Sequence, residues 1–283
     1  MSTPPDITRR TAQRERQERI RERVLADGFV RLDPLAHEFG VSLMTVHRDL
    51  DALEAQGWLR KVRGGATAQP SAQFHGNLRH RLQAMTEEKE ALAVAALTLV
   101  EPGQSIMVDE STTALHLAQR LPGCGPLSVI THFLPAITLL AGQPGIDVIA
   151  LGGAYLPAYE AFFGVMTADA ARSLRADILF MSTTAVTDGR CYQQSQETIV
   201  INRAQMEASA VRVLMVDHSK LERRSLYPLA ELTEFDLVLM DAGAPERDVE
   251  DLRALGVCVH VVGADGGTAI PPLATLRRAE RRG

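Results

Sequence analysis

Cysteine is scarce in this sequence and is not grouped. Cys124, Cys191 and Cys258 are far apart and follow none of the paired spacings that hold zinc. This pattern excludes a disulfide-stapled scaffold and indicates a reducing compartment. It also gives no reason to expect a metal or another cofactor.

Long apolar runs are missing as well. No stretch approaches the ~18 apolar residues of a membrane helix. The polar residues 1–6 are followed by an arginine-rich stretch, without the apolar core of a signal peptide. We therefore expect a cytoplasmic protein without a membrane partner.

Positive charge is not in excess, because the formal net charge is -5. It is nevertheless unevenly distributed: residues 1–65 hold 12 Lys and Arg against 10 Asp and Glu, and the rest holds 18 against 25. Only the N-terminal part therefore has the charge that suits a nucleic acid. Its surplus is small, so we expect tight binding to need two or more copies of the chain.

Residues 42–65 combine a helix with a basic turn. Ser42 suits the N-cap position, because its hydroxyl can accept a hydrogen bond from a free amide of the first turn. Val46, Leu50 and Leu53 recur at helical spacing. Gly57 stands where glycine commonly ends a helix. The cations that follow precede a Gly-Gly pair and suit phosphates.

The upstream sequence predicts two more helices. One spans Thr11 to Asp27, with Ile20, Val24 and Leu25 on its inner face. The other has Asp33 at the N-cap and Pro34 in the first helical position, and Gly40 makes the turn into the next helix.

Residues 42–65 alone would fit an amphipathic surface helix and a turn. With two helices before them they predict a winged helix-turn-helix, whose recognition helix points its N-terminal end at base edges. We expect contacts with double-stranded DNA from Ser42, Leu43, Met44, Thr45, His47, Arg48, Arg60, Lys61 and Arg63.

The composition divides the chain into parts. Residues 66–80 are rich in Ala, Gln and Ser and show little periodicity, which is typical of a linker. We therefore predict a DNA-binding domain over 1–65, a linker over 66–80, a larger domain over 81–277 and a charged tail over 278–283.

The larger domain alternates short apolar runs with helical segments, which favours a mostly parallel sheet covered by helices, an α/β fold. The predicted strands are 105–109, 127–131, 146–151, 177–183, 211–217, 236–241 and 257–262. The predicted helices are 86–100, 112–121, 132–141, 164–174, 197–208 and 245–255.

Ligands of open α/β sheets bind beyond the carboxyl ends of the strands, and four polar turns fall there. Residues 109–113 open a helix with hydroxyls and free amides that suit a phosphate, although simple capping by Ser111 or Thr112 is the blander explanation. The other turns are Gly152-Gly153, residues 182–184 and residues 217–220. Each alone fits an ordinary turn or a surface lysine, and their convergence on one sheet edge favours a site.

These segments together resemble the DeoR family of bacterial transcription regulators. The N-terminal likeness covers Val41-Ser42, residues 45–50, Leu53, residues 57–59 and residues 63–66. The C-terminal likeness covers residues 109–113, 151–153, 163–164 and 217–220, with Glu197, Arg203 and Met206. It implies a domain that shares its fold with ribose-5-phosphate isomerase and coenzyme A transferases. It also implies a sugar phosphate or related metabolite that binds there and alters operator affinity.

The resulting effector-binding set contains residues from all four turns and from one later helix. It comprises Asp109, Ser111, Thr112, Thr113, Gly152, Gly153, Thr183, Thr184, Glu197, Arg203, Asp217 and Lys220.

Four features depart from the family pattern. His47 stands where the family has an arginine, and Ser111 stands where the phosphate loop has a glycine. Glu110 adds a negative charge beside that loop, which would repel a phosphate unless it faces away. The family's glycine-containing segment after the fourth strand is replaced by residues 182–186. A non-phosphorylated or cationic ligand is therefore an alternative.

Two functions follow from these patterns. The first is a ligand-responsive DNA-binding regulator, a repressor of a carbohydrate operon that acts as a homodimer or homotetramer. The second is a sugar-phosphate isomerase with an appended DNA-binding head, in which Asp109, Glu197, Asp217 and Lys220 supply acid and base groups. Only the first uses the N-terminal part, so we expect no enzyme.

Overall fold

The computed structural model describes residues 13–21, 23–24, 29–55, 59–68, 78–264, 266 and 270. They fall into two compact units, residues 1–80 and 81–283. We call the first the head and the second the α/β domain. No helix within the described ranges is long and apolar enough to cross a membrane.

The head is built from helices and one small sheet. Residues 13–21 and 23–24 are helical, within the first predicted helix. The other elements are β1 (Phe29–Arg31), α2 (Leu32–Phe39), α3 (Leu43–Ala55), β2 (Leu59–Val62) and β3 (Gly65–Ala68), with the strands in the order β1-β3-β2. Ile20, Val24, Leu35, Val46 and Leu50 are among its buried core residues. The predicted helix stop at Gly57 lies outside the described residues.

The prediction that Asp33 caps the second helix is wrong. Helix α2 begins at Leu32, with Arg31 at the N-cap and no side-chain cap, and Asp33 lies in its first turn. The reason is the wing, the hairpin formed by β2 and β3. Leu32 N donates to Gly64 O, in the turn of this hairpin, at 3.2 Å, and this bond satisfies an amide that a cap would otherwise serve. The predicted turn at Gly40 is confirmed, since Gly40 has the left-handed φ of 61° that glycine adopts without strain.

The predicted linker begins too early and ends too late. Residues 65–68 form strand β3, which pairs with both β1 and β2. Residues 78–83 form helix α5 (Leu78–Gln83), which contains the boundary between the two units. Both segments are too short for their periodicity to stand out from a polar linker.

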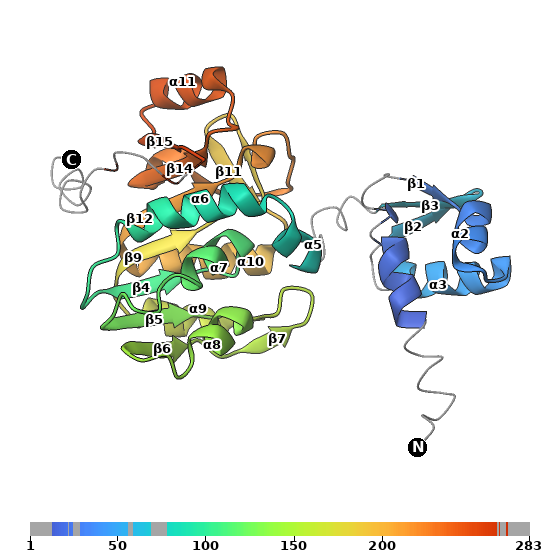
Figure 1. Ribbon diagram of the computed structural model, residues 1–283, viewed down its shortest axis with the longest axis horizontal. Helices are drawn as coiled ribbons and strands as arrows, with labels where there is room; N and C mark the ends of the chain where they lie inside the picture. The colour runs from blue at the N-terminus through green and yellow to red at the C-terminus, as the bar shows by residue number, and fades with distance from the viewer. Residues whose placement is uncertain are drawn as a thin grey trace. The chain divides into compact units, whose positions relative to one another are not determined.

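The α/β domain is organised on a seven-stranded parallel sheet, as predicted (Figure 1). Its strands are β4 (Ser105–Val108), β5 (Leu127–Thr131), β6 (Ile146–Ala150), β9 (Ala176–Met181), β12 (Ser209–Val216), β14 (Leu237–Asp241) and β15 (Val259–Val262). All seven predicted strands are present. Their order is β15-β14-β12-β9-β4-β5-β6, so the direction of winding reverses between β4 and β9.

Helices cover both faces of this sheet (Figure 1). They are α6 (Thr86–Leu97), α7 (Thr112–Ala118), α8 (Leu134–Leu140), α9 (Val165–Arg172), α10 (Gln196–Glu207) and α11 (Glu246–Ala254). Helices α6, α7 and α8 lie on one face, and α9 and α10 lie on the other. The mixed α/β class predicted from the sequence is therefore confirmed.

The small antiparallel elements were not predicted. Strands β7 (Ala154–Leu156) and β8 (Ala161–Phe163) form a hairpin, and β10 (Ala185–Thr187), β11 (Arg190–Gln193) and β13 (Tyr227–Glu231) form a three-stranded sheet. Two 3-10 turns, His218–Lys220 and Leu232–Glu234, complete the domain. Runs of three to five residues carry too little alternation to be recognised as strands.

Candidate DNA interface and effector site

Helix α3 presents a row of side chains opposite its buried stripe. Val46, Leu50 and Leu53 are buried in the head. At the N-terminal end of the helix, Leu43 is 45% exposed and Met44 is 63% exposed. Arg48 is also exposed, and Thr45 and His47 are half-buried. Large apolar side chains rarely stand in water at a helix start without a partner to cover them, and thymine methyl groups are such a partner.

The start of α3 is capped as predicted. Ser42 Oγ accepts a hydrogen bond from Thr45 N at 3.2 Å. The same oxygen lies 2.9 Å from Thr45 Oγ1. Ser42 therefore fixes the helix end and the hydroxyl of Thr45, and its own hydroxyl is already in use.

The wing lies beside this helix. Its turn contains Arg63, which is exposed. Lys61 N donates to Glu54 Oε1 at 2.7 Å, and the Lys61 ammonium pairs with Asp51. Lys61 would therefore exchange a carboxylate for a phosphate on binding DNA. The side chain of Arg60 lies outside the described residues.

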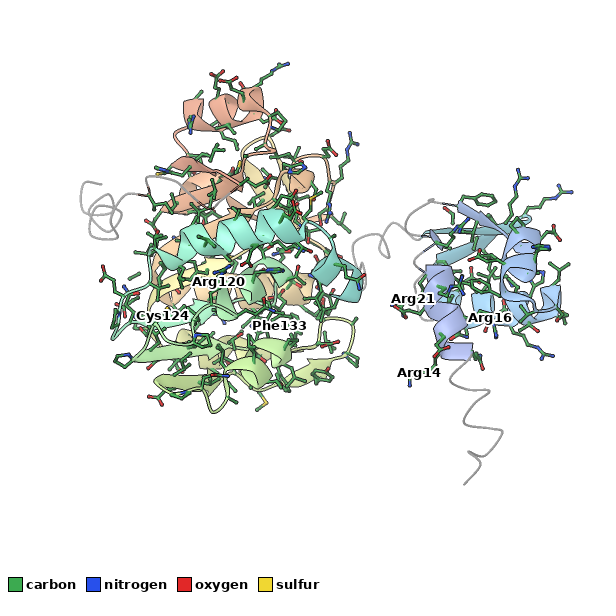
Figure 2. All side chains as sticks on the ribbon, viewed as in Figure 1. Arg14, Arg16, Arg21, Arg120, Cys124 and Phe133 are labelled. Atoms are coloured by element: carbon green, nitrogen blue, oxygen red, sulfur yellow. The ribbon has the colours of Figure 1, made fainter. Side chains whose placement is uncertain are left out.

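A buried carboxylate that the sequence did not single out holds α3 in place. Asp49 is 1% exposed and accepts hydrogen bonds from Arg16 Nε at 2.6 Å and from Gln17 Nε2 at 2.9 Å (Arg16 is labelled in Figure 2). Loss of one partner from such a pair leaves a buried charge uncompensated. The first helix of the head therefore positions the recognition helix through Asp49.

In the α/β domain the predicted loop lies at the reversal of strand order. Asp109 follows β4, and Ser182 follows β9, the neighbouring strand. Asp109 Oδ2 accepts from Ser182 N at 2.9 Å, and Asp109 Oδ1 accepts from Ser111 N at 3.0 Å. This is the crevice in which doubly wound sheets bind ligands. Asp109 joins the two strand ends and shapes the loop.

Ser111 has the capping role that was the simpler explanation for it. Its Oγ accepts from Ala114 N at 3.0 Å and donates to Asp109 Oδ1. Thr112 and Thr113 begin helix α7 and are buried at this edge. The first turn of α7 therefore still begins at this edge of the sheet, although Ser111 stands where the family has a glycine.

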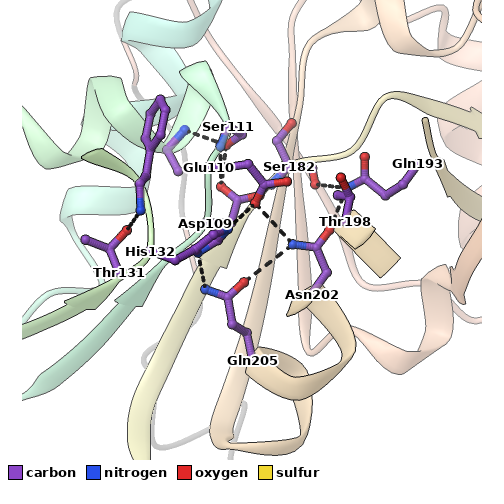
Figure 3. Close-up of polar contacts among 12 residues, drawn as sticks. Asp109, Glu110, Ser111, Thr131, His132, Ser182, Gln193, Thr198, Asn202 and Gln205 are labelled. Atoms are coloured by element: carbon purple, nitrogen blue, oxygen red, sulfur yellow. Dashed lines mark hydrogen bonds and ion pairs between the residues drawn. The ribbon is translucent and has the colours of Figure 1, made fainter. Parts of the chain in front are cut away.

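Glu110 faces a buried partner, which answers the concern that it repels a phosphate. Its Oε2 lies 3.0 Å from His132 Nε2 and 3.4 Å from Asn202 Nδ2 (Figure 3). Burial opposes the charged form, but the hydrogen bond and charge of His132 outweigh it and lower the pKa of Glu110. The carboxylate is therefore ionised and compensated inside the domain.

The same network reaches three other elements (Figure 3). Gln205 Nε2 lies 3.5 Å from His132 Nδ1, and Gln193 Nε2 donates to Asn202 Oδ1 at 2.8 Å. Gln193 Nε2 also lies 3.3 Å from Ser182 O. Helix α10 and strand β11 are thereby tied to the loop after β4. None of these partners was predicted, because each lies far from Glu110 along the chain.

A cluster of four cations forms the electrostatic centre of this edge: Arg81, Lys89, Lys220 and Arg223. Lys220 Nζ lies 3.7 Å from Asp217 Oδ2, and Arg223 Nη2 donates to Ser219 Oγ at 3.0 Å. Lys89 donates to the carbonyls of Arg81 and Ala84. We call these four side chains the cation cluster.

The charges of the cation cluster act on one another. Burial lowers the pKa of Lys220 to about 7, and the nearby Arg223, Arg81 and Lys89 add to that effect while Asp217 opposes it. Burial likewise lowers the pKa of Lys89 to about 8. Burial, helped by the charge of Glu110, raises the pKa of Asp109 to about 7. Excess positive charge, poorly hydrated, is therefore gathered where an anion would relieve it.

Some predicted effector residues are engaged by the protein itself. Thr183 Oγ1 donates to Tyr192 O at 2.7 Å, and Thr184 Oγ1 donates to Gln193 Oε1 at 3.0 Å. A Cβ at Gly153 would lie 2.1 Å from Thr167 Oγ1, whose hydroxyl donates to Gly152 O at 2.9 Å. Gly153 therefore admits helix α9 close to the backbone, whereas a Cβ at Gly152 would meet nothing within 4 Å.

Arg203 is not at this edge, contrary to the prediction. Its Nη2 lies 3.3 Å from Glu234 Oε1, and Glu234 O accepts from Arg212 Nη1 at 3.2 Å. Arg212 lies in the first half of β12, and its amide donates to Asp236, the residue just before β14, so Arg203 lies toward the amino ends of these strands. By contrast, Glu197 is exposed in the first turn of α10. Its charge adds to the effect of burial, which raises the pKa of Tyr159, a neighbour of Arg81.

Three members of the cation cluster were missed. Arg81 and Arg223 carry no local signal, because their common surroundings come from segments about 140 residues apart. Lys89 did carry one: it is the single cation of α6, a helix whose other buried residues are Ala and Leu. A buried lysine among small apolar residues calls for partners or a function.

A winged helix-turn-helix head joined to an α/β domain with a doubly wound parallel sheet is the architecture of a DNA-binding transcriptional regulator with a sensor domain. Residues 16–72 match the family model of the DeoR-like helix-turn-helix domain. Residues 84–242 match that of the DeoR C terminal sensor domain. The chain therefore belongs to the DeoR family of transcriptional regulators, and not to the isomerases.

Relatives match most of the length of the chain. A lactose phosphotransferase system repressor of Staphylococcus epidermidis is 32% identical over 88% of this chain and 98% of its own length. A putative aga operon transcriptional repressor of Escherichia coli O157:H7 is 27% identical over 89% and 95%. Ribose 5-phosphate isomerase A of Methanocaldococcus jannaschii overlaps 49% of this chain and 55% of its own, with 18% identity and a TM-score of 0.36, a likeness too slight to support an argument.

Proposed function

We propose that the protein represses a carbohydrate operon and that a phosphorylated sugar releases or modulates its binding to the operator. The observation that carries the effector class is the cation cluster. A phosphate monoester brings a charge of about -1.5 to -2 at pH 7, and it would restore the charged form of Lys220. A neutral sugar would bring no charge to offset the mutual repulsion of Lys220, Arg223, Arg81 and Lys89, and a cation would add to it.

The crevice also offers groups that suit the sugar. Thr112 and Thr113 begin α7, whose first amides face the same edge as Lys220 and Asp217. Amides at a helix start, and hydroxyls, can donate hydrogen bonds to a phosphate or a sugar oxygen. The relatives support this class, since two of them are named for the lactose phosphotransferase system and the aga operon.

On the DNA side, the proposal assigns direct readout to the exposed end of α3. Arg48 is the main candidate for a guanine, and Leu43 and Met44 are candidates for thymine methyl groups. Lys61, Arg63 and Arg60 contact phosphates from the wing. Because residues 1–65 have a surplus of only two positive charges, the working form is a homodimer or homotetramer in the cytoplasm, with two heads on paired half-sites.

Thermal denaturation of the full chain tests the effector class. We expect a pentose or hexose monophosphate to raise the melting temperature, because a ligand that binds only the folded state stabilises it by mass action. The panel includes inorganic phosphate, the matching unphosphorylated sugars, polyols and sugar acids.

Two variants sharpen this test. Lys220→Met loses the response to the phosphorylated ligand, and Arg175→Met, which removes an exposed cation just before β9 at the amino edge, keeps it. An unphosphorylated sugar that stabilises the protein as well as its phosphate ester does would refute the assignment of a phosphate.

A further inference from the structure

Two buried carboxylates lie side by side where β12 and β14 end. Val216, the last residue of β12, is in register with Met240 of β14, so Asp217 and Asp241 follow at the same level of the carboxyl edge. Asp217 is 1% exposed and Asp241 is 3% exposed. Asp217 pairs with Lys220, whereas the proposed function leaves Asp241 without a role.

Asp241 binds the first residue of the turn His218–Lys220 at two points. Its Oδ1 accepts from His218 N at 2.5 Å, and its Oδ2 lies 2.8 Å from His218 Nδ1. Oδ2 also accepts from Gly243 N at 2.8 Å. A Cβ at Gly243 would lie 2.4 Å from His218 Nδ1, so glycine leaves the room that the pair needs. The carboxylate therefore fixes both the backbone and the ring of His218.

The bond between this ring and Asp241 is assisted by charge. It is the main cause that raises the pKa of His218, and the charges of Asp241, Asp217 and Glu88 of α6 act in the same direction, while burial opposes them. Such bonds are stronger than those between neutral groups. Asp241 therefore has a firm hold on the start of the turn from a second strand.

The other end of the same turn carries Lys220. Ser219 donates its hydroxyl to Asp217 and accepts a hydrogen bond from Arg223 Nη2 at 3.0 Å. Lys220 N donates to Asp217 O at 3.0 Å. Because only Ser219 separates the two residues, a displacement of His218 displaces the backbone of Lys220 as well.

We propose that Asp241, acting through His218, is the positioning residue that aims the ammonium of Lys220 at the anionic group of the effector. This inference rests on the proposed function and concerns a residue that the effector itself does not contact. A binding group has to be held within about 0.5 Å of its productive geometry by neighbours that lock it in place. Asp217 holds the turn from β12, and Asp241 completes the lock from β14.

The test uses the full chain, with inorganic phosphate and the sugar monophosphate that most raises the melting temperature as probes. Calorimetry measures the affinity for each probe. DNA affinity, with and without the probe, is measured on a duplex that the protein itself selects from random sequence. Thermal denaturation confirms that each variant is folded.

Three variants change the pair in different ways. His218→Ala removes the ring and leaves Asp241 its two backbone donors, so we expect it to fold. His218→Asn places an amide nitrogen near the position of Nδ1 and so restores a donor to Asp241 without an imidazole. Gly243→Ala removes no polar group, but its methyl group pushes the ring away from Asp241.

We expect His218→Ala and Gly243→Ala to bind both probes about tenfold more weakly, as loss of a charge-assisted hydrogen bond predicts. They should need correspondingly more probe to change their DNA affinity. His218→Asn should return to within about threefold of the wild-type affinity, because the hydrogen bond sets the turn. His37→Ala, which removes an exposed histidine of α2, is the control and binds the probes as the wild type does.

The outcomes separate the two proposals. If either His218→Ala or Gly243→Ala binds both probes as the wild type does, while Lys220→Met does not bind, Asp241 does not position Lys220 and only this inference is overturned. If His218→Asn binds as weakly as His218→Ala, the effector needs the ring itself, which overturns it as well. If no phosphorylated compound binds the wild type, the proposed function fails, and this inference fails with it.

Discussion

Lys220→Met should make the protein more stable while it abolishes the effector response. Lys220 is 9% exposed, and burial lowers the pKa of its ammonium to about 7. At ~1.4 kcal/mol per pH unit, the distance from the ordinary value of 10.5 sets an upper limit of roughly 5 kcal/mol on the cost of folding with this charge. Methionine fills a similar volume without that cost.

Part of the gain is lost through Asp217. Lys220 helps to keep the pKa of that buried carboxylate low, together with Ser219, Arg223 and Lys89. Since three of these partners stay, we expect a net gain of about 1–3 kcal/mol. For a domain of this size each kcal/mol moves the melting temperature by ~2–4 °C, so the rise should be roughly 2–12 °C.

The change in stability with pH provides a second test of this prediction. Below pH 7 the lysine is protonated in both the folded and the unfolded chain, and the full cost is present. Between pH 7 and about 10 only the unfolded chain keeps the proton, so wild-type stability rises with pH from this group. The advantage of Lys220→Met should therefore shrink from pH 7 to pH 10.

Differential scanning calorimetry of both proteins and of the Arg175→Met control measures this difference without ligand. A melting temperature for Lys220→Met below that of the wild type at pH 7 would show that the ammonium stabilises the fold. An advantage that stays constant up to pH 10 would show that the lysine is not the titrating group. Either result refutes the reasoning.

Three other expectations follow from the structure. Arg48→Ala should weaken binding to the selected operator by ~1–3 kcal/mol without a change in melting temperature, because Arg48 is exposed on α3; normal retention of the duplex in a gel shift would contradict it. Asp49→Ala should lower the temperature at which the head unfolds, because it breaks a buried ion pair worth ~3–5 kcal/mol. Near-ultraviolet circular dichroism of the single Trp can follow this unfolding, and Asp51→Ala, on the exposed side, is the control. Gly153→Ala should destabilise the α/β domain by ~1–3 kcal/mol through its clash with Thr167, and an unchanged urea midpoint would rule out that close approach.

Sequence pattern was sufficient where the deciding interactions are local. Apolar runs located all seven strands of the parallel sheet, since the central strands are nearly continuous runs buried on both faces, although the edge strand β6 is largely exposed. Ser42 was recognised as a cap because its partner, the amide of Thr45, is three residues away. The cap at Asp33 failed because its competitor, Gly64, comes from the wing about 30 residues later.

The candidate site was predictable only in part, for the same reason. The turns at residues 109–113 and 217–220 lie at the carboxyl edge because strand topology brings them there. Their electrostatics depend on Arg81, Lys89 and Arg223, which no local pattern connects to them. Arg203 illustrates the reverse case: its helix was placed correctly, but its partner Glu234 lies at the other end of the sheet.

The free energy needed to couple effector binding to DNA binding is small compared with the cost of burying the charges of the cation cluster. An allosteric effect of ~1–3 kcal/mol changes operator affinity ~5–150-fold. The cost of the charged Lys220 alone has an upper limit of roughly 5 kcal/mol, and burial lowers the pKa of Lys89 as well. An anion that relieves even half of this cost would stabilise the ligand-bound state by an amount in that range. The repulsion among these cations is therefore a sufficient source for the response, without any large rearrangement of the sheet.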